Sequence, residues 1–108
     1  AVYQEFLYTY DTTDLSIVWS TYAMADVGAV SAAIQIEVKT MAGVSEGTAE
    51  VAVLGDGAWA LKSATLGLAA LGMNSGELYK VQISIKSDGP GAGFNINMEG
   101  GSCYITKT

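Results

Sequence analysis

The ten residues LYKVQISIKS at positions 78–87 alternate strictly between apolar and polar side chains. One face of this stretch would carry the apolar side chains Tyr79, Val81, Ile83 and Ile85. The opposite face would carry Lys80, Gln82, Ser84 and Lys86. A period of two residues is that of a β-strand with one buried face, whereas a helix needs apolar spacings of three and four. The stretch therefore predicts a half-buried strand.

Similar patterns recur along the rest of the chain, at residues 2–10, 15–24, 30–40, 48–53, 58–66, 94–99 and 103–107. Turn residues separate most of them. The strongest hairpin signal is Asp56-Gly57, since glycine accepts a positive φ. Gly100-Gly101 is expected to turn the chain between the last two strands. Residues 67–76 hold three glycines and therefore allow at most one short helical turn.

Eight short strands with turns between them predict an all-β fold, an antiparallel eight-stranded sandwich or jelly roll. A length of 108 residues is near the commonest size of one domain, so residues 1–108 are expected to form a single β-sandwich or jelly-roll domain. Ala1 in place of Met predicts that an initiator Met or a signal peptide has been removed.

The charge balance argues against several classes of partner. The chain has five Lys, no Arg and eleven Asp plus Glu, which gives a net charge of −6. Because proteins bind phosphate backbones through Lys and Arg, we expect no nucleic acid as a partner. Anionic membrane surfaces are disfavoured for the same reason, and no apolar run is long enough for a membrane span.

The residue types needed for catalysis are missing or scattered. The chain has no His, the commonest general base, so its many Ser and Thr have no evident activator. We therefore expect no enzyme and assign no catalytic, cofactor-binding or metal-binding residue. Calcium stays open as an alternative, because carboxylates lie at the expected strand ends, although Asp is also a usual turn residue. These carboxylates are Asp11, Asp14, Asp26, Asp56 and Asp88.

Two tryptophans and one cysteine are the remaining candidates for a site. Trp19 and Trp59 both lie in apolar stretches, so a core position is expected for each. The alternative is that Trp59 stacks on a sugar ring, as aromatic side chains do in many carbohydrate-binding modules. Cys103 has no partner for an internal disulfide and is expected to be a half-buried strand residue, with an intermolecular disulfide or a reactive thiol as the alternative.

Two runs in the C-terminal third carry a family resemblance. They are NSGELYKVQI at residues 74–83 and GFNINMEGGSCYI at residues 93–105. These runs resemble the closing strands of jelly-roll domains of the complement/tumour-necrosis-factor type, and also the small β-domains of phage tail-fibre tips and capsid decorations. The resemblance implies a trimeric assembly with a structural or receptor-binding role, and it carries over no catalytic residue.

Composition also predicts self-association. Hydrophobic residues make up 50% of the chain and charged residues only 15%, which is apolar for a small monomer. Two weakly patterned stretches supply the surplus, and Val30, Leu68 and Leu71 are the interface residues that we expect in them. A closed homo-oligomer, with a trimer favoured, would bury them. The alternative is that both stretches simply fill one core.

These observations favour one function and leave a second open. We expect a non-enzymatic structural subunit of a virion-associated (capsid decoration or fibre) or extracellular protein assembly, with a larger protein assembly as its partner. The alternative is a secreted carbohydrate-binding module that holds a glycan on surface aromatic side chains, Trp59 among them.

Overall fold

The computed structural model describes residues 2–27, 32–87 and 96–108, and the side chains of residues 4–27, 32–85 and 101–108. This part of the chain forms seven strands and one short 3-10 turn, η1 (Ala69–Leu71). The strands are β1 (Val2–Thr9), β2 (Asp14–Ala25), β3 (Ala32–Thr40), β4 (Ser45–Val53), β5 (Ala60–Gly67), β6 (Leu78–Ser87) and β7 (Ile96–Lys107). Within the described residues, no helix is long and apolar enough to cross a membrane.

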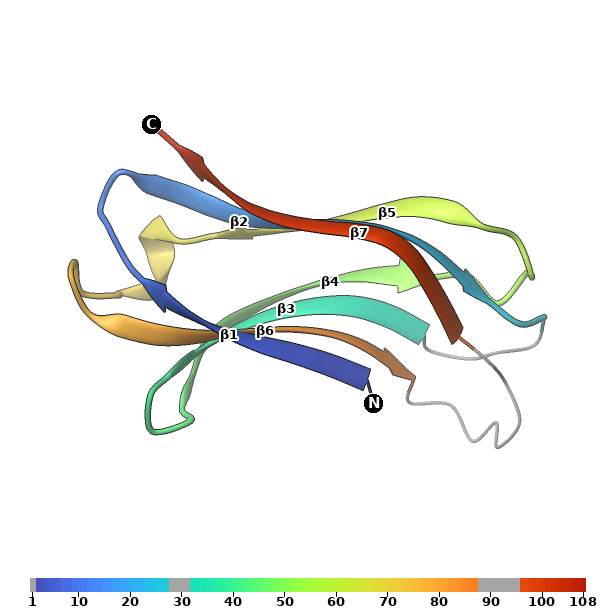
Figure 1. Cartoon of the computed structure of the whole chain (residues 1–108), viewed down its shortest axis with the longest axis horizontal. Helices are drawn as coiled ribbons and strands as arrows, with labels where there is room; N and C mark the ends of the chain where they lie inside the picture. Colours follow the sequence, from blue (N-terminus) through green and yellow to red (C-terminus); the bar gives the residue numbers. More distant parts are fainter. Residues whose placement is uncertain (1, 28–31, 88–95) are drawn as a thin grey trace.

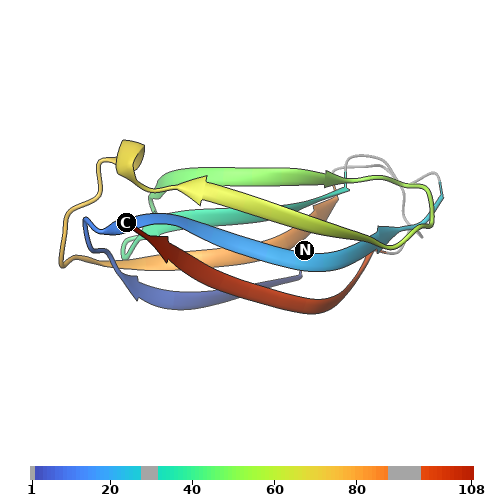
Figure 2. The same ribbon diagram turned by 90° about the horizontal axis from the view of Figure 1, so that it is seen from above.

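The strands form two antiparallel sheets that pack face to face (Figure 1). The four-stranded sheet has the order β1-β6-β3-β4, and the three-stranded sheet has the order β5-β2-β7. Seen from above, β4 and β5 lie along one side of the sandwich, and β1 and β7 lie along the other (Figure 2). The predicted antiparallel sandwich is confirmed, and of the two architectures expected the structure has the sandwich.

The core lies between the inner faces of the two sheets. Ile34, Ile36 and Val38 of β3 are fully buried there, in one core cluster with Ile17 and Trp19 of β2. Burial of such alternating apolar side chains is the main favourable term in folding. The alternation seen in the sequence therefore decides which face of each strand turns inward.

The strand predicted at residues 78–87 is β6, with the same bounds. Tyr79, Val81 and Ile85 are buried, as the alternation predicts. Four neighbours differ from the simple pattern: Ile83, Lys80 and Gln82 are half-buried, and Ser84 on the outer face is 5% exposed. A central strand is flanked on both sides, so a small outward side chain such as that of Ser84 is screened by its longer neighbours.

The last two predicted strands are one continuous strand, β7, which is why the structure has seven strands and not eight. The register along β2 passes from Ser20 opposite Ser102 to Tyr22 opposite Glu99. Two residues of β7, Gly100 and Gly101, therefore oppose Thr21 alone, which makes a β-bulge. The prediction of a turn at Gly100-Gly101 is wrong, because a glycine pair also suits a bulge within a strand.

The Asp56-Gly57 turn does not make the predicted hairpin. Gly57 has a φ of +71° and Asp56 accepts a hydrogen bond from the Ala58 N–H at 3.0 Å, so the local turn chemistry is as expected. However, β4 and β5 belong to different sheets, and this connection carries the chain across the sandwich. Local turn signals do not specify whether the next strand pairs with the previous one.

Candidate functional site

The outer face of the four-stranded sheet is charged and internally paired. Lys39 forms an ion pair with Glu5 at 3.5 Å and donates a hydrogen bond to Gln82 at 2.6 Å. Gln35 donates to Glu50 at 3.0 Å across β3 and β4. This face is a typical solvated surface.

The outer face of the three-stranded sheet is different, because none of its described side chains is charged. We call it the uncharged face, made of Ser16, Val18, Ser20, Tyr22, Leu61, Ser63, Thr65, Ser102, Tyr104 and Thr106. Three large side chains on it are strongly exposed: Tyr22 at 51%, Leu61 at 59% and Tyr104 at 52%. Tyr22 and Leu61 stand directly opposite each other in the β2–β5 register.

Hydroxyl groups fill the space between these larger side chains. Ser16 and Thr106 are hydrogen-bonded at 2.5 Å across β2 and β7, and Ser20 and Ser63 at 2.8 Å across β2 and β5. Val18, flanked in register by Thr65 and Tyr104, is 7% exposed, so it gives the face a packed apolar centre. The result is a sheet surface of aromatic, aliphatic and hydroxyl groups that can bind an uncharged partner surface.

The two tryptophans have different positions. Trp19 is 3% exposed and belongs to the core, as predicted. Trp59 lies just before β5 and is 48% exposed, so the expectation of a core position is wrong for it. Its indole is accessible to a ligand, as the stacking alternative requires. The physical reason is that β5 begins only at Ala60, after the crossing from the other sheet.

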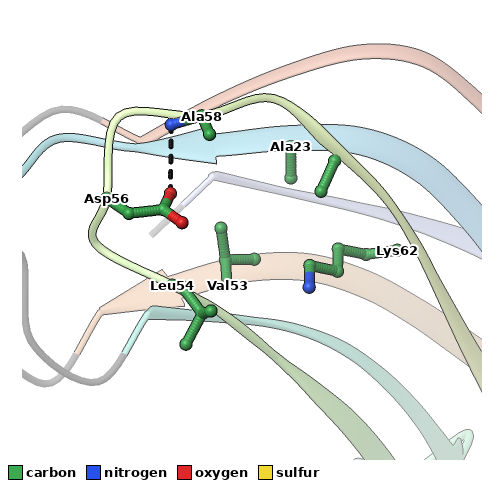
Figure 3. Close-up of a pocket in the computed structure, with 7 residues that line it drawn as sticks. Ala23, Val53, Leu54, Asp56, Ala58 and Lys62 are labelled. Carbon is green, nitrogen blue, oxygen red and sulfur yellow. Dashed lines mark hydrogen bonds between the residues drawn. The ribbon is translucent and has the colours of Figure 1, made fainter.

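A small pocket lies where β4 crosses to β5 (Figure 3). Ala23, Val53, Leu54, Ala58 and Ala60 give it apolar walls, and Asp56 and Lys62 complete the lining. Lys62 lies opposite the buried Thr21 in the register and extends between the sheets, so it is an inward-pointing charge on an edge strand. Within the described part of the chain, neither a hydrogen bond nor an ion pair joins Lys62 to Asp56.

Asp14 is the one charged residue among the buried side chains of the described chain, at 4% exposed. Its carboxylate accepts hydrogen bonds from the Tyr8 hydroxyl, the Lys107 ammonium and the Asp11 N–H, so it joins β1, β2 and β7. Burial favours the neutral acid, but the hydrogen bonds from Lys107 and Tyr8 outweigh it and hold the pKa of Asp14 below its usual value. Burial and the bond to Asp14 raise the pKa of Tyr8.

Three of the five carboxylates considered for calcium, Asp11, Asp14 and Asp56, accept hydrogen bonds from nearby protein groups. Both Asp14 oxygens are occupied by protein donors, and Asp11 accepts hydrogen bonds from the Thr13 N–H and hydroxyl. Among the described residues, no group of three or more His, Cys, Asp or Glu is close enough to hold a metal ion. Asp88 lies outside the described residues.

The three residues expected at an interface differ in where they lie. Leu68 is fully buried in the core of its own chain, and Leu71 is half-buried against that core. Both positions correspond to the alternative in which these stretches fill one core. Val30 lies outside the described residues. Cys103 is half-buried on the inner face opposite Trp19, and burial raises the pKa of its thiol, which makes it a weak nucleophile.

Sequence patterns alone did not identify Tyr22, Leu61 and Tyr104 as a group. The available signal was that β2 carries apolar side chains on both faces, Ile17 and Trp19 on one and Val18 and Tyr22 on the other. A strand of this kind has either a second buried face or an apolar exposed one.

Comparisons with known proteins add no family and no relative. No family model matches the chain, and no curated protein or solved structure matches it either.

Proposed function

We propose that the chain is a non-enzymatic structural subunit of a virion-associated or extracellular protein assembly, and that it associates with copies of itself through the uncharged face. The observation that carries this proposal is the contrast between the two outer faces. One has paired charges, and the other exposes Tyr22, Leu61 and Tyr104, with none of its described side chains charged. The backbone register sets one acidic residue, Glu99 of β7, opposite Tyr22. Exposed apolar area of this kind marks an interaction surface.

A second copy is the occupant that the charges favour. Each chain has a net charge of −6, so two copies repel each other wherever acidic surfaces meet. Contact through the uncharged face keeps most charges away from the interface. Aromatic side chains are enriched at such interfaces. The hydroxyl groups that surround them can replace hydrogen bonds to water with hydrogen bonds to the partner.

The residue inventory supports a structural role over a catalytic one. The chain has no His and no Arg, and its one cysteine has a raised pKa. Cyclic symmetry is the usual way to close such an assembly, and the resemblance of the C-terminal third to trimeric jelly-roll domains favours a trimer.

Sedimentation velocity over a wide range of protein concentration tests the proposal. The wild type is expected to form a discrete oligomer, and Tyr22→Lys is expected to shift it to a smaller species because an ammonium would be buried at the contact. Val44→Lys is the matched control, since Val44 is 62% exposed but lies in the β3–β4 turn. A monomeric wild type, or equal effects of both variants, would contradict the proposal.

The exposure of Trp59 favours glycan binding as a second candidate function. Its indole is 48% exposed near one end of β5, and an uncharged saccharide could stack on it. A glycan array would detect this activity, which Trp59→Ala should abolish. Leu54→Ala is the control, because Leu54 is a comparably exposed apolar residue at the other end of the same connection. Loss of binding in both variants would exclude stacking on Trp59 as the cause.

A further inference from the structure

The four edge strands of the sandwich differ in how they are protected. An edge strand presents unpaired backbone N–H and C=O groups, and proteins commonly block such edges with bulges or inward-pointing charges. β4 has a register irregularity near Ser45, β7 has the Gly100-Gly101 bulge, and β5 has the inward-pointing Lys62. These devices would hinder another strand from pairing with three of the four edges.

β1 has none of these devices. It pairs with β6 in an unbroken register from Val2 opposite Ile85 to Thr9 opposite Leu78, and it contains no Lys, Pro or Gly. Its charged residue, Glu5, is ion-paired with Lys39 on the outer face. Among the described strands, none pairs with the other edge of β1.

The core is also incompletely covered on this side. The four-stranded sheet packs against a three-stranded one, and β1 and β7 lie on the same side of the sandwich (Figure 2). Phe6 on the inner face of β1 and its neighbour Ile83 are only partly buried. On the outer face, Leu7 is 61% exposed. A strand added beside β1 would cover apolar side chains on both faces of the sheet.

We propose that β1 pairs edge to edge, antiparallel, with β1 of a second copy about a two-fold axis at Phe6. The two four-stranded sheets then form one continuous sheet, and the two inner faces stay on the same side. This axis sets Phe6 beside its copy and Glu5 opposite Leu7. An axis at Glu5 would set two carboxylates opposite each other, which is unfavourable. The contact is separate from the uncharged face and goes beyond the proposed function.

Mixed-disulfide trapping tests this register. Glu5→Cys and Leu7→Cys are made separately in a Cys103→Ser background, mixed, and oxidised with glutathione disulfide. Directly opposite residues of antiparallel strands have Cβ atoms about 4.5–5.5 Å apart, near the range that a disulfide bridges, whereas diagonal pairs are farther apart. Among the cross-linked dimers, mass spectrometry should therefore show a larger fraction with one chain of each variant than random pairing would give. Each variant alone should cross-link poorly.

Thr48→Cys mixed with Glu50→Cys provides the matched control, because both residues are exposed on the outer face of another edge strand, β4. This pair is expected to give no preferred mixed dimer. Circular dichroism checks that each variant is folded. The proposal is overturned if the Glu5→Cys and Leu7→Cys chains cross-link at random or not at all.

Two further measurements distinguish β1 pairing from association through the uncharged face, so that either proposal can fail without the other. Repeating the trapping in a Tyr22→Lys background should leave the mixed dimer intact, because Tyr22 lies on the other sheet. In the wild type, amide exchange in β1 should slow as protein concentration rises, because the free edge becomes hydrogen-bonded. Exchange in β1 that does not change with concentration would contradict the pairing even if the uncharged face does self-associate.

Discussion

At the scale of the residue, the cluster around Asp14 ties together strands that are far apart in sequence. Tyr8 from β1 and Lys107 from the end of β7 both donate to its carboxylate. Removing the acceptor would leave the Tyr8 hydroxyl without this partner in a buried position. Burial without a hydrogen-bond partner is costly, so the cluster helps to hold the C-terminal end of β7 in place.

Asp14→Asn keeps one acceptor oxygen but replaces the other with an amide donor and removes the charge that Lys107 faces, so it is expected to lower the free energy of unfolding by about 1–3 kcal/mol at pH 7. The pKa of Asp14 is lower in the folded chain than its ordinary value, so its contribution is complete above about pH 4 and is lost as the pH falls through the folded pKa. Urea unfolding at several pH values should therefore show the gap between wild type and variant narrowing in acid. A gap that does not change with pH would show that the charge of Asp14 is unimportant.

Truncation of two isoleucines compares the stability contributed by a core residue with that contributed by a residue at the margin of the core. Ile36 is fully buried, so Ile36→Ala should cost about 2–5 kcal/mol, the usual range for a buried Ile. Ile83 is half-buried at the margin, so the same change there should cost clearly less. Urea unfolding of both variants is the measurement. In dilute protein, where the chain is monomeric, equal losses would show that Ile83 is already covered within the single chain. At concentrations where β1-paired dimers form, the loss at Ile83 should approach that at Ile36.

At the scale of the element, η1 packs against β4 through one close contact. A Cβ added at Gly47 would lie 2.5 Å from Leu71 Cδ2, so the Leu71 side chain would have to move. Gly47→Ala is expected to destabilise the chain by at most about 1 kcal/mol through this overpacking, because the displaced atoms are the end of the half-buried Leu71 side chain. In a double-mutant cycle, adding Leu71→Ala should recover part of that loss, and strictly additive effects would show that the two residues do not interact.

Strand pairing at this scale explains the two departures from the expected turns. Gly100-Gly101 forms a bulge because β2 runs alongside both halves of β7. Asp56-Gly57 crosses between sheets because β4 pairs with β3 and β5 pairs with β2. The residues around each turn are compatible with either outcome, and the position of the neighbouring strands selects one.

At the scale of the whole molecule, charge should regulate association. Two chains that each have a net charge of −6 repel over distances comparable with the Debye length, which is about 10 Å at 0.1 M salt and longer at lower salt. Added salt screens this repulsion and leaves apolar contacts intact. The sedimentation coefficient at fixed protein concentration should therefore rise with salt. A fall would indicate that ion pairs hold the oligomer together.

The sequence by itself determined the strands and their inward faces. In residues 78–87 and 30–40, a period of two follows from local geometry, since successive side chains of a strand point to opposite sides. The same local signals predicted the short turn after β5, where Gly72 with a φ of +69° ends η1. They also placed Trp19 in the core.

Only the tertiary structure decided which strands share a sheet, and this assignment creates the candidate surfaces. The uncharged face exists because β5 and β7 flank β2, which brings Leu61 and Tyr104 onto the same face as Tyr22. Leu68 is buried and Trp59 is exposed because of where the two ends of β5 meet the rest of the sandwich. Pairing joins residues that are distant in sequence, so a pattern with a period of two cannot specify it.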